Sequence, residues 1–359
     1  MKITFSNLFL SLFIATTILV SACKKPKDPT EDTIPEISRK VYVLNEGSFS
    51  NSNSSVSIFD LSQSNMFNGM FSNANDRPLG DVLNSMKVIN DKAYFVVNNS
   101  DKIEYTEKFP LSSLGVINGL SEPRYIQEVS PTKAYVSEHI SFGNSIGRLS
   151  IIDLTTNTIT STINVGPSPE GMHYENGKLF VCISGSNNVI VVNTSNDAIE
   201  STITVVGRPT NFVKDVNNKL WLICRGNIAY DALWNEDEAN SVAGALVRID
   251  PSASSVEQTY TFSNSLGDPS KLTINGAKNI LYFTYANALY SFGIGDANLP
   301  TTPFINRRFY GVGVDPLTNI VYTGTFGFTS NEKMIRYTSA GAPIDSFSVG
   351  IGPNGFVFE

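Results

Sequence analysis

Residues Gly166–Gly207 read GPSPEGMHYENGKLFVCISGSNNVIVVNTSNDAIESTITVVG, and this stretch decides the fold. It divides into four short runs rich in β-branched and aromatic residues, which are GMHYEN, KLFVCIS, NVIVVN and IESTITVV. Turn-forming Asn, Gly, Ser and Asp residues separate the runs, and this pattern predicts four hairpin-linked strands. A single sheet of four strands cannot bury both of its faces, so the next question is whether the unit repeats.

The repeat is visible through one aromatic residue in the second strand of each unit. These residues are 40–61 positions apart and are Tyr42, Tyr94, Tyr135, Phe180, Trp221, Tyr282 and Tyr322. A base period of about 40 residues with insertions is typical of a propeller blade, whereas a β-helix or solenoid has shorter repeats. The first unit lacks a strand before Tyr42, and a spare strand, Asn354–Glu359, ends the chain. We therefore predict an all-β, seven-bladed β-propeller closed by the C-terminal strand, which completes the first blade.

The N-terminal segment has the pattern of a processing signal. Met1-Lys2 is followed by the apolar stretch Ile3–Val20 and then by Val20-Ser21-Ala22-Cys23, which resembles a bacterial lipobox. We expect a lipoprotein signal peptide over residues 1–22 and lipidation of Cys23. The alternative is an ordinary signal peptide with an incidental cysteine.

The mature chain is then expected to have two parts. Residues 23–38 are charged and Pro-rich and predict a flexible tether, and residues 39–359 predict a single propeller domain. Lys24 favours the outer membrane by analogy with lipoprotein sorting, and the nearby acidic residues favour display at the cell surface. The expected location is thus the outer membrane, with the lipid as the only membrane contact.

Composition and missing motifs exclude several function classes. The net charge is −7 and the folded part has no Lys/Arg cluster, so a nucleic-acid partner is not expected. HExxH, zinc-ligand spacings, an EF-hand loop and G-x-S-x-G do not occur, so we predict no catalytic residue, metal or cofactor. His173 lies in a predicted channel-lining strand and leaves an acid–base role open, with a packed or solvated histidine as the alternative. Cys182 and Cys224 are expected on opposite sheet faces, buried and without a disulfide.

Four polar residues at the ends of third strands have two interpretations. They are Asp60, Asp153, Asn193 and Asp250. They could be metal ligands, but their repetition at equivalent positions favours side chains that bond to the backbone two residues later and start a turn.

One face of the propeller is expected to carry the function. Connections from fourth to first strand and from second to third strand share this face, which we call the variable face, because its loops differ most in length. The longest insertion, residues 227–243, carries aromatic and acidic side chains, and arginines recur in the fourth-to-first connections, where they suit an anionic or amide-rich ligand. The candidate ligand-binding residues are Arg124, Arg208, Arg225, Tyr230, Trp234, Tyr285, Arg308, Tyr310 and Phe326. In the alternative interpretation, the arginines and loop aromatics only anchor their own loops.

These repeats resemble the YVTN/YncE-like seven-bladed propeller family over roughly residues 40–359. The resemblance rests on Gly166-x-x-Pro169-Glu170-Gly171, Lys178-Leu179-Phe180-Val181 and Asn188–Asn193. The opening Val41–Phe49 resembles the cell-surface propeller lipoproteins of Bacteroidota. One branch of those lipoproteins captures corrinoids such as cobalamin for a TonB-dependent transporter, and the resemblance implies this role by analogy only.

The leading functional hypothesis is a non-catalytic surface lipoprotein for nutrient uptake that binds a small molecule or partner protein on the variable face. Corrinoid capture beside a TonB-dependent outer-membrane receptor is its most specific form. Two other classes stay open: a propeller enzyme of lyase or lactonase type that uses His173 or His139 with a divalent metal, and an adhesion or scaffold module that binds through the Trp234 loop.

Overall fold

The computed structural model describes residues 39–141, 143 and 145–359. Almost all of its regular structure is strand, with one short helix, α1 (Met70–Asn75), and one 3-10 turn at Asn98–Ser100. The strands in chain order are β1 (Lys40–Asn45), β2 (Ser55–Asp60), β3 (Asn65–Phe67), β4 (Leu83–Ile89), β5 (Lys92–Val97), β6 (Lys102–Glu107), β7 (Ser113–Ile117), β8 (Pro123–Ser130), β9 (Lys133–Glu138), β10 (Gly147–Asp153), β11 (Thr158–Gly166), β12 (Pro169–Glu175), β13 (Lys178–Ile183), β14 (Asn188–Asn193), β15 (Ala198–Thr204), β16 (Pro209–Lys214), β17 (Leu220–Cys224), β18 (Asn227–Tyr230), β19 (Glu236–Val242), β20 (Ala245–Asp250), β21 (Ser255–Thr261), β22 (Ser270–Ile274), β23 (Ile280–Tyr285), β24 (Ala288–Gly293), β25 (Gly311–Val314), β26 (Val321–Gly324), β27 (Lys333–Tyr337), β28 (Pro343–Ser348) and β29 (Pro353–Phe358).

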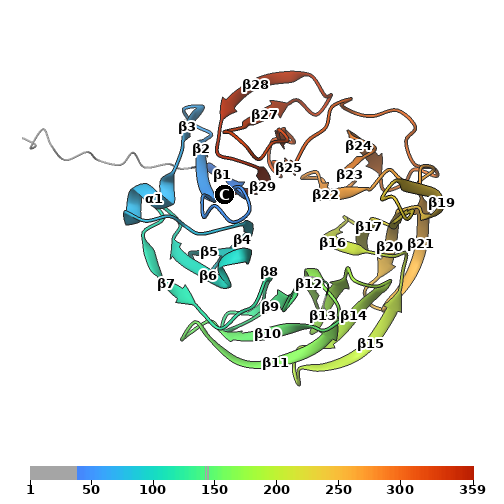
Figure 1. Ribbon diagram of the computed structural model, residues 1–359, viewed down its shortest axis with the longest axis horizontal. Coiled ribbons are helices and arrows are strands. Elements are labelled where there is room, and N and C mark those ends of the chain that lie inside the picture. The colour runs from blue at the N-terminus through green and yellow to red at the C-terminus, as the bar shows by residue number, and fades with distance from the viewer. Residues whose placement is uncertain (1–38, 142, 144) are drawn as a thin grey trace, which may run out of the picture. The chain divides into compact units, whose positions relative to one another are not determined.

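The strands form seven antiparallel blades around a central axis (Figure 1). From the axis outward, blade 1 is β29-β1-β2-β3, blade 2 is β4 to β7, blade 3 is β8 to β11 and blade 4 is β12 to β15. Blade 5 is β16-β17-β20-β21, blade 6 is β22 to β24 and blade 7 is β25 to β28, while β18 and β19 form a separate hairpin within blade 5. The predicted all-β, seven-bladed propeller is confirmed.

The C-terminal strand closes the ring as predicted. β29 pairs antiparallel with β1, with Phe358 opposite Val41 and Gly355 opposite Leu44. Closure matters because it removes two free sheet edges that would otherwise stay unpaired.

Blade 6 departs from the four-stranded pattern. Its outer segment carries Pro300 and Pro303, which have no backbone N–H to donate to a ladder. This segment pairs with β24 only through an isolated bridge between Leu289 and Ile305. The repeat spacing did not predict this loss of a fourth strand.

The hydrophobic core lies between the blades. Each described interface between neighbouring blades contains one cluster of buried side chains. The repeated aromatic residue of each blade is at most 2% exposed and packs in the cluster shared with the next blade, from Tyr42 between blades 1 and 2 to Tyr322 between blades 7 and 1. A blade therefore buries both of its faces only when two neighbours flank it, which is why the unit has to repeat.

Two smaller predictions are also confirmed. Cys182 and Cys224 are free and buried, and burial raises the pKa of both thiols. Cys182 lies on the face of blade 4 that packs against blade 5, and Cys224 lies on the face of blade 5 that packs against blade 4. Both therefore belong to the cluster between these two blades. The four polar residues that end third strands each accept a backbone N–H from two positions later, for example Ser62 N to Asp60 Oδ1 at 2.8 Å, so they start turns.

Candidate functional site

A cavity of about 580 Å³ lies at the propeller axis on the variable face. Its lining comes from loops and strand ends of blades 1, 2, 3, 5, 6 and 7, so it spans the axis and does not lie in a single interface. The lining combines charged side chains with tyrosine and phenylalanine rings. A cavity of this size, with a few converging polar groups, is typical of a small-molecule site.

Bulges in the innermost strands supply many of the polar groups around this cavity. In six blades the register between the innermost strand and its neighbour shifts directly after the first residue of the innermost strand. The second residue of that strand therefore has no partner opposite it, and we call it the bulge residue. The bulge residues are Asn84, Arg124, Glu170, Thr210, Lys271 and Asn354. A bulge redirects a side chain out of the regular alternation. In blade 7 the innermost strand is regular, and Gly311 leaves no room for a side chain, because a Cβ there would be 2.5 Å from the carbonyl oxygen of Pro353.

The bulge residues connect blades to one another around the axis. Asn354 Nδ2 donates to the carbonyl oxygen of Leu83 at 3.0 Å, and Asn84 Nδ2 donates to that of Arg124 at 2.5 Å. Lys271 Nζ donates to the carbonyl oxygen of Asn354 at 3.3 Å. The inner rim of the propeller is thus held by polar contacts, whereas the core between the blades is apolar.

Glu170 is a nearly buried carboxylate between two basic side chains. Arg124 Nε lies 3.1 Å from Glu170 Oε1, and His139 Nε2 lies 3.1 Å from the same oxygen. Burial would raise the pKa of Glu170, but Arg124 and His139 outweigh it, so its pKa lies below the usual value. The carboxylate therefore stays charged and satisfies Arg124, which lines the cavity.

Arg225 and Asp268 form a bidentate ion pair on another side of the cavity. Arg225 Nε donates to Asp268 Oδ1 at 2.7 Å, and Nη2 contacts Oδ2. Burial would lower the pKa of Arg225, but Asp268 outweighs it and raises that pKa. Such a two-point pair fixes the guanidinium in place.

Lys271 is held differently, because the structure shows no carboxylate paired with it in the described residues. Its backbone has a φ of +55°, which is rare for a residue with a side chain. Its Nζ lies 4.9 Å from the ring centre of Tyr310, whose hydroxyl donates to Glu46 Oε2 at 2.5 Å. Burial lowers the pKa of Lys271, and the charges of Arg124 and Arg225 lower it further, although Glu46 opposes them.

Aromatic rings form another part of the wall. The Arg308 guanidinium lies 3.6 Å from the ring centre of Phe326, and Tyr310 packs edge-on against both Phe326 and Phe328. Tyr285 stacks on Phe262 with ring centres 4.4 Å apart. Phe326 is 43% exposed, so an apolar surface is open to a ligand beside the charged groups.

The structure brings seven of the nine predicted ligand-binding residues to this cavity. They are Arg124, Arg225, Tyr230, Tyr285, Arg308, Tyr310 and Phe326. Arg208 does not line the cavity, but it is close enough to Arg225 that burial and this neighbouring charge lower its pKa. Trp234 is 82% exposed in the connection between β18 and β19, with its ring centre 6.2 Å from that of Tyr230.

Several polar residues of the lining are not among the nine predicted ones, and those that carry the argument below are Glu46, Asn84, Asp268 and Lys271. A signal for Asn84 and Lys271 was present, because in six of the seven blades the opening dipeptide, such as Pro123-Arg124 or Ser270-Lys271, puts a polar residue second.

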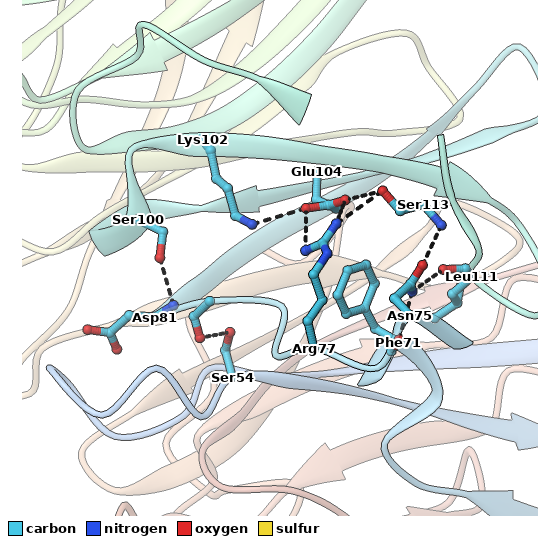
Figure 2. A network of polar contacts seen from close by, with 11 residues as sticks. Ser54, Phe71, Asn75, Arg77, Asp81, Ser100, Lys102, Glu104, Leu111 and Ser113 are labelled. Atoms are coloured by element: carbon cyan, nitrogen blue, oxygen red, sulfur yellow. Dashed lines mark hydrogen bonds and ion pairs between the residues drawn. The ribbon is translucent and has the colours of Figure 1, made fainter. Parts of the chain in front are cut away.

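Arg77, another arginine in a fourth-to-first connection, anchors its own blade and does not line the cavity. Figure 2 shows its guanidinium beside Glu104, with Nη2 2.6 Å from Oε1. Lys102 and Ser113 contact the same carboxylate, which is fully buried. Burial would raise the pKa of Glu104, but these partners together lower it. For Arg77 the anchoring interpretation is therefore correct.

Metal and histidine chemistry finds little support in the described part of the chain. Outside residues 1–38, 142 and 144, no group of three His, Cys, Asp or Glu side chains is arranged to hold a metal ion. His173 lies in β12, 3.5 Å from Glu175, and does not line the cavity. In the same described residues, no helix has the length and apolarity needed to cross a bilayer. The lipobox and Cys23 lie outside the described residues.

Comparison with known proteins places the chain in one family and one fold. The family profile described as "Domain of unknown function (DUF5074)" matches residues 40–350. No curated protein matches the sequence. Among solved structures, similar ones include a quinonprotein alcohol dehydrogenase-like protein from Bacteroides thetaiotaomicron (14% identity, TM-score 0.66, covering 90% of this chain and 78% of that one). A functionally unknown protein from Desulfotomaculum acetoxidans (12%, 0.65, 89% and 99%) and a periplasmic gluconolactonase from Pseudomonas aeruginosa (10%, 0.64, 89% and 99%) are also similar. At these identities the likeness shows the propeller fold alone.

Proposed function

The chain belongs to the DUF5074 family, whose description assigns no activity, and we propose that it is a binding protein that captures a small solute in its axial cavity. One observation carries this proposal. Polar and aromatic side chains from six blades converge on a cavity of about 580 Å³, and seven of them had been selected from sequence as candidates. Loops on the variable face form much of the cavity lining, as is typical of binding sites on repeat scaffolds.

Native mass spectrometry tests this proposal directly. The purified protein is incubated with a mixture of small nutrients, and the complex is expected to show one added mass per chain that unfolding releases. A protein that retains no solute from any mixture, at solute concentrations in the millimolar range, would contradict it.

We also propose that Cys23 anchors this protein to the outer membrane, with the propeller at the cell surface. The lipobox and the charged tether support this location. Metabolic labelling with a fatty acid is expected to mark the wild type and not Cys23→Ser. Protease added to intact cells should cleave the protein; protection until the cells are lysed would place it in the periplasm.

Corrinoid capture beside a TonB-dependent receptor is the most specific form of the proposal. Its support is the resemblance of Val41–Phe49 and the repeats to the propeller lipoproteins of Bacteroidota. Isothermal titration with cobalamin and with cobinamide tests it, and the absence of heat at micromolar protein would remove this form while leaving solute capture intact.

A propeller enzyme of lactonase type is the second candidate. The observation that favours it is the pair formed by His139 and Glu170 beside the cavity, because a histidine next to a carboxylate can transfer protons. Hydrolysis of a sugar lactone by the wild type, lost in His139→Ala, would support it. A wild-type rate equal to the uncatalysed rate would exclude it.

A further inference from the structure

We propose that the solute carries one anionic group, a carboxylate or a phosphate, which binds Lys271, and an apolar or aromatic body that packs beside it. The inference rests on the proposed solute capture and specifies the chemistry of the solute. Its basis is the difference in how the basic groups of the cavity are satisfied.

Three carboxylates at or beside the cavity are already engaged by other groups, whereas a fourth, Glu236, lines the cavity from the β18–β19 hairpin. Glu170 is held by Arg124, and Asp268 by Arg225 in a bidentate pair. Glu46 accepts from the Tyr310 hydroxyl at 2.5 Å and from Asn354 Nδ2 at 3.1 Å. Arg124 and Arg225 are thus each neutralised by a carboxylate of the protein.

Lys271 is, with Arg308, one of the two basic side chains of the cavity lining that no carboxylate pairs with in the described residues. Among the described residues its contacts are a carbonyl oxygen at 3.3 Å and the face of Tyr310, which together use little of the capacity of an ammonium with three donors. Burying such a charge costs free energy unless an opposite charge pairs with it. A ligand anion at Nζ would provide that charge, and it would also relieve the repulsion from Arg124 and Arg225.

The backbone at Lys271 supports a role at the site. Its φ of +55° places a long side chain in the left-handed region, which residues other than glycine adopt only rarely. The bulge in β22 imposes this conformation and directs Lys271 to the cavity lining. Strain at a residue that lines a cavity is a recurrent feature of binding sites.

The neighbouring rings define the second part of the ligand. Tyr310 contacts Lys271 directly, and Phe326 continues the same wall under the guanidinium of Arg308. Arg308, like Lys271, is paired with no carboxylate in the residues that the structure describes, so it can turn to the edge of a bound anion. An anionic group joined to a flat or apolar body would therefore use both surfaces at once.

The test uses isothermal titration of the full-length protein with four probes. Phenyl phosphate and benzoate carry an anion on an aromatic body, inorganic phosphate carries the anion alone, and benzyl alcohol carries the body alone. We expect one of the two aromatic anions to bind most tightly, which identifies phosphate or carboxylate as the preferred group. Inorganic phosphate and benzyl alcohol should bind at least about ten-fold more weakly, because each makes only half of the contacts.

Three variants distinguish a direct contact between Lys271 and the anion from the unspecific effect of replacing a lysine in this blade. Lys271→Met should lower the affinity for the best probe by about ten-fold or more, which is the usual effect of losing one charge-assisted hydrogen bond. Lys271→Arg should restore part of the affinity. Lys278→Met is the matched control, because Lys278 has a φ of +56° in the same blade but is exposed and does not line the cavity; its affinity should equal that of the wild type.

The results can refute an anionic solute at Lys271 while leaving the proposal of solute capture intact. Equal affinity of Lys271→Met and wild type, or equal binding of benzyl alcohol and the aromatic anions, would refute it. If Lys271→Met does not fold, the wild type decides: the affinity for the aromatic anion should fall as sodium chloride rises, and salt independence would refute the inference. If no anion binds while mass spectrometry finds a neutral solute, solute capture stands and the anionic ligand is wrong. If no solute of any kind binds, both are wrong.

Discussion

Replacing Glu170 by glutamine should destabilise the propeller, because the substitution leaves Arg124 without its counter-charge. Glu170 is 8% exposed and contacts Arg124 and His139 at 3.1 Å. Removing one partner of a buried ion pair costs about 3–5 kcal/mol. Glutamine keeps one acceptor oxygen and the Arg124 side chain is still 24% exposed, so we expect the low end, about 3 kcal/mol.

Urea unfolding followed by circular dichroism measures this loss. Glu200→Gln is the matched control, because Glu200 lies in the outer strand of the same blade, and its ion pair with Lys178 at 2.8 Å is exposed. Exposed pairs contribute about 0–1 kcal/mol, so the control should stay close to the wild type. The interpretation of Glu170 as a buried counter-charge is wrong if the two variants lose the same free energy.

The same comparison has a defined pH dependence. The pKa of Glu170 is lower in the folded protein than in the unfolded chain, so its stabilising contribution is fully present above the unfolded value of about 4.3. That contribution is lost as the pH falls through the lower, folded pKa. The difference in stability between wild type and Glu170→Gln should therefore shrink below about pH 4. A difference that grows on acidification would contradict the assigned sign.

Three further predictions concern other parts of the propeller. Deleting residues 353–359 removes the strand that pairs with β1, so the deletion protein should lack the cooperative thermal transition of the wild type; an unchanged transition would show that ring closure is dispensable. Cys182 and Cys224 should not react with Ellman's reagent until urea unfolds the chain, because both are fully buried with raised pKa values, and rapid labelling in the native state would contradict the packing. Replacing residues 231–235, the exposed end of the β18–β19 hairpin, by a Gly-Asn turn should change the stability by less than about 1 kcal/mol, since Trp234 and Leu233 are 82% and 81% exposed. If that replacement abolishes binding of a partner protein in a pull-down from membranes while the solute still binds, the hairpin is a docking element.

The fold could be predicted because its signal is repeated. Tyr42, Tyr135 and Trp221 sit at equivalent positions and pack between successive blades, so one pattern is read several times along the chain. The loss of the fourth strand in blade 6 is a single event caused by two prolines, and an average over repeats hides it. The face that carries the cavity was also predictable, because the longest insertion, residues 227–243, lies on it.

The internal pairing of the site could not be predicted in the same way. Arg124 lies in the first strand of blade 3 and Arg225 follows the second strand of blade 5, yet each pairs with a carboxylate of the next blade, Glu170 and Asp268 respectively. The partners are 46 and 43 positions apart in neighbouring blades, and no local pattern in the sequence shows which carboxylate of the next blade each arginine contacts. Lys271 is predictable only in part, since its place as the polar second residue of a blade opening is visible in the sequence but the bulge that directs its side chain to the cavity is not.

Closure of the ring and assembly of the cavity are coupled through one residue of the last strand. Asn354 of β29 donates to Glu46, which follows β1, and to the carbonyl oxygen of Leu83 in blade 2. Its own carbonyl oxygen accepts from Lys271 of blade 6. An open ring would therefore lack the residue that joins three sides of the cavity, so the site exists only after the C-terminal strand has paired with β1. A bound solute that contacts Lys271 should in turn favour the closed ring, because any ligand that binds only the folded form stabilises it.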